Sequence, residues 1–389
     1  MRFAYIANGT LWIQQDDRPP RGVQSRFVSE AKERAARSQR AHGWKNADRD
    51  EPRGLIPNEM LWRSRAATDE ATVPRFRHVA PGPDDDTLFY VMELGRTVGL
   101  FEYHLAEDRE VRILHSADFQ CDGLHYDRQT DRLIIARTGQ DGRTHLQELD
   151  REGNPKGLLT GGDCQDVAPT LSPGDPGAVH FQSSGLALHP NSGHVVALSP
   201  ARVSRLDRRN REVTTLLEHE GDDCIAPRMD PRGSIYYIRR PYERPYKASF
   251  TDQMMDMLLF PWRLLKAVFG YLNFFSMIYG KEPLKTAGVP KGAGLDQDLG
   301  RLWLHGRLIE IAKVRRGSPQ DGIVPGSWRL VRRQSDGTES VVAKQVASFD
   351  VATDGAVVYT NGFDIHRFPS RDLKPLARAD LVEKVVALD

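Results

Sequence analysis

The sequence predicts an all-β fold, a six-bladed β-propeller, and three observations lead to this prediction. Short apolar strands alternate with turns rich in Asp, Pro and Gly. Groups of four such strands recur roughly every 40–60 residues, the spacing of propeller blades. Both ends of the chain also have the pattern of strands, so they can share one blade and close the ring. We therefore expect residues 1–389 to form a single domain.

The repeat is clearest in two segments, DVAPTLSPGDPGAVHFQS (166–183) and CIAPRMDPRGSIYYIRR (224–240). Pro169 aligns with Pro227, and a strand–turn–strand pattern follows each. Weaker copies are found in three further segments, at 78–94, 121–138 and 346–362. One blade cannot cover both of its own faces, so repeated blades are expected to stack around a ring.

Five blades are predicted within the chain, at 76–118, 119–163, 164–222, 223–340 and 341–380. The sixth combines LVEKVVALD (381–389) with RFAYIANG and TLWIQQ at the start, and LIPNEMLWRS (55–64) could supply its fourth strand. A different division of the strands in 300–340 would give seven blades.

The turn pattern A-P-x-(L/M)-(S/D)-P resembles the TolB-type, WD40-like (PD40) repeat propellers. The resemblance implies a ring of six blades that binds proteins. TolB itself is periplasmic and has an N-terminal α/β domain, and this sequence shows neither a secretion signal nor that domain. Related propellers precede peptidase domains, but the sequence contains no G-x-S-x-G nucleophile motif.

Composition bounds the function only loosely. Charged residues make up 28% and the net charge is +1, so no global field indicates nucleic acid as a partner. Three cysteines cannot form a disulfide framework. Together with the interrupted apolar N-terminus, this predicts a cytoplasmic protein, which we expect to be bacterial.

The first predicted insertion, at 17–54, is basic and helical, and it belongs to the terminal blade. Residues 18–65 carry twelve Lys and Arg against six Asp and Glu. The basic arm comprises Arg26, Lys32, Arg34, Arg37 and Arg40. It is either a solvated helix on the rim or a contact for an acidic protein surface, lipid head groups or phosphate.

The second predicted insertion, at 243–300 within the fourth blade, contains an apolar helical stretch at 250–280 with one narrow polar stripe. Arg263 and Lys266 lie in its middle, which argues against a membrane span. Three interpretations remain open: a lid folded back on the propeller, a protein contact, or a helix in a membrane interface. The contact residues would be Phe260, Trp262, Leu265, Phe269, Leu272, Phe274 and Phe275.

No catalytic motif, metal motif or cofactor motif stands out, so we predict no cofactor. Cys121, Asp166 and Cys224 share one repeat position, which makes them weak metal candidates, and Cys164 lies two residues before Asp166. The predicted function is a non-catalytic scaffold that binds protein in a larger assembly. By analogy of fold alone, that assembly could be an AAA-type ATPase system. The alternatives are a metal- or carboxylate-dependent hydrolase with its site at the central channel, and a propeller at a membrane surface.

Overall fold

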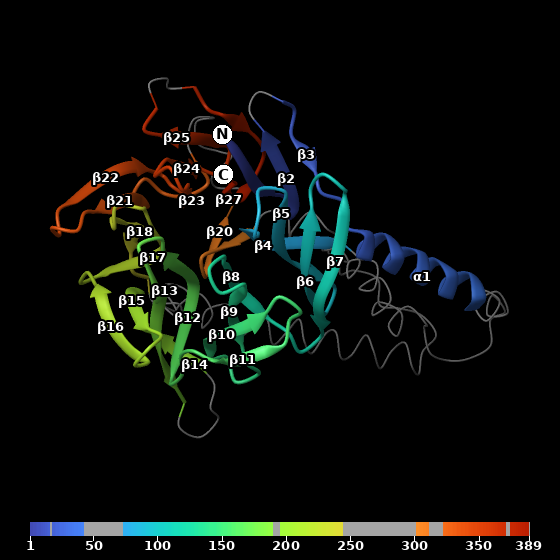
Figure 1. Ribbon diagram of the computed structural model, residues 1–389, viewed down its shortest axis with the longest axis horizontal. Coiled ribbons are helices and arrows are strands. Elements are labelled where there is room, and N and C mark those ends of the chain that lie inside the picture. Colours follow the sequence, from blue (N-terminus) through green and yellow to red (C-terminus); the bar gives the residue numbers. More distant parts are fainter. Residues whose placement is uncertain are drawn as a thin grey trace, which may run out of the picture.

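The structure of the protein is a computed structural model, which describes residues 1–15, 18–42, 73–189, 195–243, 301–310, 322–370 and 374–388. Most of these residues lie in antiparallel strands, arranged in four-stranded sheets and in one nine-stranded sheet whose two units are joined by a single parallel pair (Figure 1). This confirms the all-β prediction.

The two ends of the chain share one sheet, as predicted. We call it the terminal sheet, and its strand order is β27-β1-β2-β3. Its strands are β27 (Val382–Leu388), β1 (Arg2–Ala7), β2 (Thr10–Gln15) and β3 (Arg21–Gly22). The fourth strand among the described residues is thus β3, whereas the segment expected in that role, 55–64, lies outside them. Figure 1 shows the N-terminus and C-terminus side by side.

The remaining strands follow in chain order as five further units. The second unit consists of β4 (Pro74–Pro81), β5 (Thr87–Leu94), β6 (Thr97–His104) and β7 (Arg109–Ser116), and the third of β8 (Cys121–Asp127), β9 (Arg132–Thr138), β10 (Thr144–Asp150) and β11 (Pro155–Leu158). The fourth unit consists of β12 (Cys164–Ser172), β13 (Asp175–Leu188), β14 (Val195–Leu198), β15 (Arg202–Asp207) and β16 (Glu212–Leu217). The fifth unit consists of β17 (Asp222–Met229), β18 (Ile235–Pro241), β21 (Arg329–Arg333) and β22 (Glu339–Lys344), and the sixth of β23 (Ser348–Val351), β24 (Val357–Thr360), β25 (Asp364–Phe368) and β26 (Ala377–Arg378).

The innermost strands form a closed circle. In ring order, β27 contacts β4, β4 contacts β8, β8 contacts β12, β12 contacts β17, β17 contacts β23, and β23 returns to β27. This circle, in the part of the chain that the structure describes, identifies the fold as a β-propeller. The blade number for the whole chain stays a prediction, because 43–72 and 244–300 lie outside that part.

Strand β1 shows why the units must stack. Its side chains alternate between two apolar clusters: Phe3 and Tyr5 pack with Val358 of the sixth unit, and Ala4 and Ile6 pack in the cluster that contains Tyr90 of the second unit. Because successive side chains of a strand point to opposite faces, a strand that is apolar from Phe3 to Ala7 must be covered on both sides. The terminal sheet is therefore held between its two neighbours.

The Ala-Pro repeat marks a β-bulge in two innermost strands. Ala168 and Ala226 both have φ near +53°, and the strand register shifts at each of them. A non-glycine residue with positive φ is uncommon, and bulges redirect the side chains that follow. The bulge thus fixes where Thr170 and Arg228, two residues after each alanine, point.

One helix and one hairpin lie outside these units. Helix α1 (Arg26–His42) projects away from the sheets (Figure 1). Its first turn is capped by the Ser25 hydroxyl, which accepts the Val28 N–H at 3.4 Å, and the Phe27 ring lies 5.5 Å from that of Phe101 in the second unit. The hairpin joins β19 (Arg301–Leu304) to β20 (Arg307–Glu310). Among the described residues, no helix has the length and apolar character needed to cross a membrane.

Candidate functional site

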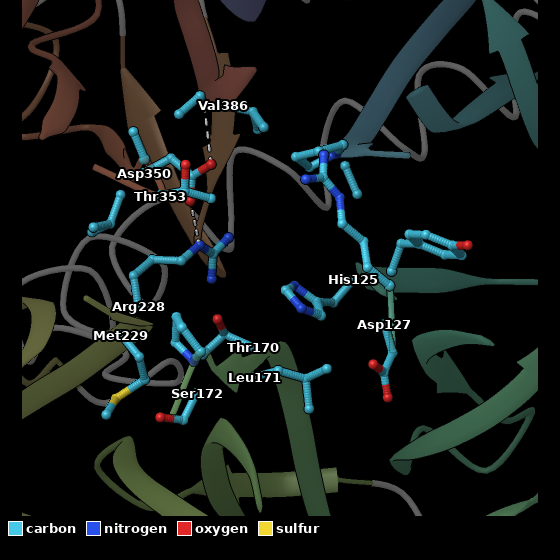
Figure 2. Close-up of a pocket in the computed structure, with 18 of the residues that line it drawn as sticks. His125, Asp127, Thr170, Leu171, Ser172, Arg228, Met229, Asp350, Thr353 and Val386 are labelled. Atoms are coloured by element: carbon cyan, nitrogen blue, oxygen red, sulfur yellow. Dashed lines mark hydrogen bonds and ion pairs between the residues drawn. The ribbon is translucent and has the colours of Figure 1, made fainter. Parts of the chain in front are cut away.

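A cavity of about 240 Å³ opens where the six innermost strands end (Figure 2). Every one of these strands contributes to its wall. The lining residues that matter most for its chemistry are Leu124, His125, Thr170, Leu171, Arg228, Met229, Asp350 and Val386. We call this site the channel mouth, because it lies at the centre of the ring.

Arg228 is the principal charged group of the channel mouth. Its Nε donates to Asp350 Oδ1 at 2.7 Å, its Nη1 donates to the Pro227 carbonyl at 2.8 Å, and the Ala387 N–H donates to Asp350 Oδ2 at 3.0 Å. In Figure 2 the guanidinium points into the cavity. Three strands from three units therefore hold one arginine in place, which lowers the entropy lost when the arginine binds a ligand.

His125 faces Arg228 from the opposite wall (Figure 2). Burial, assisted by the positive charge of Arg228, lowers the pKa of His125 to about 4. The imidazole is therefore neutral at pH 7 and can both donate and accept a hydrogen bond.

Further ionisable groups follow along the same strands, toward their beginnings. The Lys384 ammonium donates to His78 Nδ1 at 2.9 Å, and burial and the charge of Arg228 lower the pKa of Lys384 to about 8. Burial and the charge of Lys384 lower the pKa of His78 well below its usual value. His305, at the turn of the β19–β20 hairpin, donates from Nε2 to the Ala347 carbonyl at 3.0 Å, and burial lowers its pKa to about 3.

The channel therefore carries more positive than negative charge at neutral pH. Arg228 and Lys384 are cationic, whereas Asp350 faces them as a carboxylate that Arg228 already binds. A second lining carboxylate, Asp127, is bound at 2.8 Å by Arg208. Such a site favours an anionic or hydrogen-bonding group of modest size.

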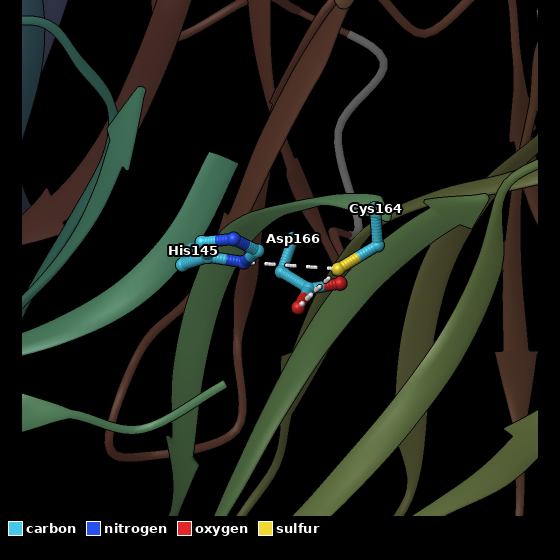
Figure 3. A group of neighbouring side chains, drawn as sticks. All are labelled: His145, Cys164 and Asp166. Atoms are coloured by element: carbon cyan, nitrogen blue, oxygen red, sulfur yellow. Dashed lines mark hydrogen bonds between the residues drawn. The ribbon is translucent and has the colours of Figure 1, made fainter. Parts of the chain in front are cut away.

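The predicted metal candidates do not come together as a set. Cys121 is buried and its thiol donates to the Gly123 carbonyl at 3.1 Å, and Cys224 is fully buried beside Tyr237. Asp166 instead lies with Cys164 and His145, whose ligand atoms all lie within 4.8 Å of one another (Figure 3).

The basic arm is present on α1, but its charge is partly matched within the helix. Arg26 pairs with Glu30 at 3.1 Å and Arg37 with Glu33 at 3.4 Å, both as exposed i,i+4 pairs. Lys32 and Arg34 are exposed, and the side chain of Arg40 lies outside the described residues. Exposed pairs of this kind stabilise a helix only slightly.

The apolar contact residues at 250–280, from Phe260 to Phe275, lie outside the described residues, so their role stays a prediction. Sequence reasoning did not identify Arg228, Asp350, Lys384 or His145 as site residues. One signal was available for Arg228, because it follows the Ala226-Pro227 bulge and aligns with Thr170 of the other repeat copy. The other three carry no local signal.

Comparison with known proteins gives similarity at the level of fold. No protein-family model matches the chain, and no curated protein matches it. Among solved structures, the chain is similar to TolB from Acinetobacter baumannii, with 12% identity, 99% of this chain and 66% of that chain covered, and a TM-score of 0.49. The tricorn protease is 12% identical, with 95% of this chain and 32% of that chain covered and a TM-score of 0.44. The β-propeller domain of the Trilobed protease from Pyrococcus furiosus is 12% identical, with 78% of this chain and 81% of that chain covered and a TM-score of 0.35.

The chain thus spans less than two thirds of the first two of these relatives, 66% of the TolB chain and 32% of the tricorn protease chain. The β-propeller class itself follows from the closed circle of innermost strands.

Proposed function

We propose that this protein is a non-catalytic β-propeller that binds another protein and receives an acidic side chain of that partner in the channel mouth. The single observation that carries the proposal is the arrangement of Arg228, which is anchored by Asp350 and directed into a cavity opposite the neutral His125. Hydrogen bonds to a charged group of this kind contribute about 1.5–3 kcal/mol each.

The size of the cavity favours a side chain over a separate small molecule. Sites for cofactors and drug-sized ligands have volumes of about 300–1,000 Å³. The channel mouth, at about 240 Å³, is smaller than this range. Its apolar wall residues, such as Leu124, Leu171 and Met229, would pack against the methylene groups of an acidic side chain.

The pairing of the carboxylates favours binding over hydrolysis. A hydrolase of the type considered above would use channel carboxylates as acid, base or metal ligands. Asp350 and Asp127 are each engaged by an arginine, at 2.7 and 2.8 Å. Although burial alone would raise it, hydrogen bonds from Thr130 and Arg208 lower the pKa of Asp127 overall, so this carboxylate is a weak base.

The apolar stretch at 250–280, predicted from the sequence to be helical, supplies the second half of the proposal. Its apolar residues would form the larger contact, and the channel mouth would add specificity for charge. We place the protein in a multi-protein assembly in the cytoplasm, as the sequence predicts. A membrane interface is the competing partner for this stretch, and liposome flotation tests it directly. Flotation of the wild-type chain that is lost when Phe269, Phe274 and Phe275 become Ser would support membrane binding.

The proposal is tested by affinity capture from the source cells with three baits: the full chain, a chain lacking 244–300, and the Arg228→Met variant. A captured protein is then purified and its binding measured by calorimetry. We expect Arg228→Met to weaken binding about 10- to 100-fold, because an ion-paired hydrogen bond is lost.

The matched control is Arg209→Met, which removes an exposed arginine on the β15–β16 turn and should leave the affinity unchanged. Equal affinity for the wild-type chain and Arg228→Met would rule out the channel mouth as the binding site. Turnover of a substrate that disappears in Arg228→Met would overturn the non-catalytic assignment.

A further inference from the structure

A histidine, a cysteine and an aspartate meet between the third and fourth units, outside the channel mouth. His145 lies on β10, and Cys164 and Asp166 lie at the start of β12. The two strands are joined by one parallel pair, Thr144 with Gln165. Side chains alternate along a strand, so His145, Cys164 and Asp166 all project from the face opposite to that pair. The register of the two units thus brings the three side chains together (Figure 3).

The distances between the three groups match those of ligands around one ion. Cys164 Sγ lies 3.8 Å from His145 Nδ1 and 3.2 Å from Asp166 Oδ2. Tetrahedral zinc, with Zn–S near 2.3 Å and Zn–N and Zn–O near 2.0–2.2 Å, separates such ligand atoms by roughly 3.3–3.6 Å. Small side-chain movements would therefore complete the geometry.

The surroundings of Asp166 also favour a cation. Its side chain is 3% exposed, and within the described ranges it has no salt-bridge partner. The Ser183 hydroxyl donates to Oδ1 at 2.7 Å, which orients the carboxylate, and Oδ2 accepts from the Cys164 thiol at 3.2 Å. Buried carboxylates are normally paired with a cation or bound to a metal, and a hydrogen bond to the second oxygen is a common feature of metal ligands.

A divalent cation also suits the charges of this set. It replaces the thiol proton of Cys164, which is released to solvent, and it balances two anionic ligands, the thiolate and the carboxylate, with its own charge.

We propose that His145, Cys164 and Asp166 bind one Zn²⁺ ion that joins the third and fourth units of the propeller. The Gly161 and Gly162 carbonyls lie 3.6 and 3.9 Å from Cys164 Sγ, so the turn at 160–163 could complete the coordination. His145 and Cys164 are only partly buried, which leaves a route for the ion. The site supplements a seam that β10 and β12 bridge at one backbone position.

The test uses the purified full chain, stripped with a chelator and titrated with Zn²⁺ in a calorimeter and with Co²⁺ in a spectrophotometer. We expect one ion per chain, a thiolate-to-cobalt charge-transfer band, and a higher Tm with Zn²⁺. Cys164→Ser should abolish the band and weaken binding at least about 100-fold. Ser183→Ala, which only orients Asp166, should weaken binding about 10-fold.

Two control variants remove the same kinds of side chain, a thiol and an imidazole, at positions outside the proposed zinc site. Cys121→Ser removes another thiol, and His219→Gln removes a histidine whose Nε2 lies 3.2 Å from the Glu339 carboxylate. Both should bind zinc like the wild type. The metal-free Cys164→Ser protein should unfold at the same temperature as the metal-free wild type, which excludes misfolding as the cause.

Absence of stoichiometric binding to the wild-type chain would overturn the proposal, as would a cobalt band that persists in Cys164→Ser. Either result would identify the three side chains as a hydrogen-bonded cluster only. The outcome is independent of the channel mouth, because its lining includes none of the three residues.

Discussion

The terminal sheet and the seam between the third and fourth units are held together in different ways. In the terminal sheet, β27 and β1 pair from Arg2–Leu388 to Ala7–Val382, and most of their side chains are apolar and buried. At the seam, an apolar cluster that includes Leu146 and Phe181 is supplemented by one parallel strand pair and a set of polar contacts. Arg208 of the fourth unit binds Asp127 at 2.8 Å and also binds Glu148, both of the third unit.

This difference shows two ways of joining neighbouring units of the ring. Apolar strands with an extended ladder of backbone hydrogen bonds stabilise the ring by burying apolar surface, which any apolar sequence of the right period supplies. Buried ion pairs stabilise it only when every partner is present, because an unpaired buried charge is costly. The first solution tolerates conservative substitution, whereas the second depends on each residue.

The largest effect is expected from Val385→Asp in the terminal sheet. Val385 is fully buried opposite Tyr5, so the substitution places an unpaired charge between two units. We expect a loss of more than about 5 kcal/mol in the free energy of unfolding, measured with urea. The control Val213→Asp, at a valine that is 50% exposed on β16, should change it by less than about 0.5 kcal/mol. Similar losses for both variants would show that burial in the terminal sheet is not decisive.

The next effect is expected at the seam, from Arg208→Met. The variant leaves Asp127, whose side chain is 1% exposed, without its cation. We expect a loss of about 3–5 kcal/mol on urea unfolding. Arg209→Met, at the exposed neighbouring position, should cost little. If the triple variant with Asp127→Asn and Glu148→Gln recovers none of the loss, the ion pairs do not explain it.

The smallest effect concerns Lys384, a buried cation of the terminal sheet that, in the described part of the chain, has no salt-bridge partner. Its native pKa of about 8 lies below the unfolded value of 10.5, so the unfolded chain binds more protons between these pH values. Wild-type stability therefore rises from pH 8 to 10.5 relative to Lys384→Met. We expect the variant to be more stable by about 3 kcal/mol at pH 7, with the difference shrinking at high pH.

Thermal unfolding at several pH values measures this difference. Lys344→Met, at an exposed position, provides the control. A difference between Lys384→Met and the wild type that does not change with pH would mean that the channel is more hydrated than its burial indicates. The different effects of Lys384→Met and Arg208→Met would then come from the geometry of the two positions rather than from the presence or absence of an ion-pair partner.

The fold was largely predictable because its determinants are local. The Ala-Pro-turn repeat and the alternation of strands and turns can be read over about twenty residues, and they predicted both the propeller class and the shared terminal sheet. Prediction was weaker where local signals are short. The fourth strand of the terminal sheet is β3, only Arg21–Gly22, which no pattern distinguishes from a turn.

The sites required the tertiary structure. Sequence alone determined that Cys164 and Asp166 share a face of one strand, since they are two residues apart. It could not bring His145 to them, because this depends on the register between two units. Arg228 and Asp350 are separated by 122 positions, and they meet only because the ring closes. Local periodicity thus determined the units, whereas the packing of units around a common centre decided which charges converge.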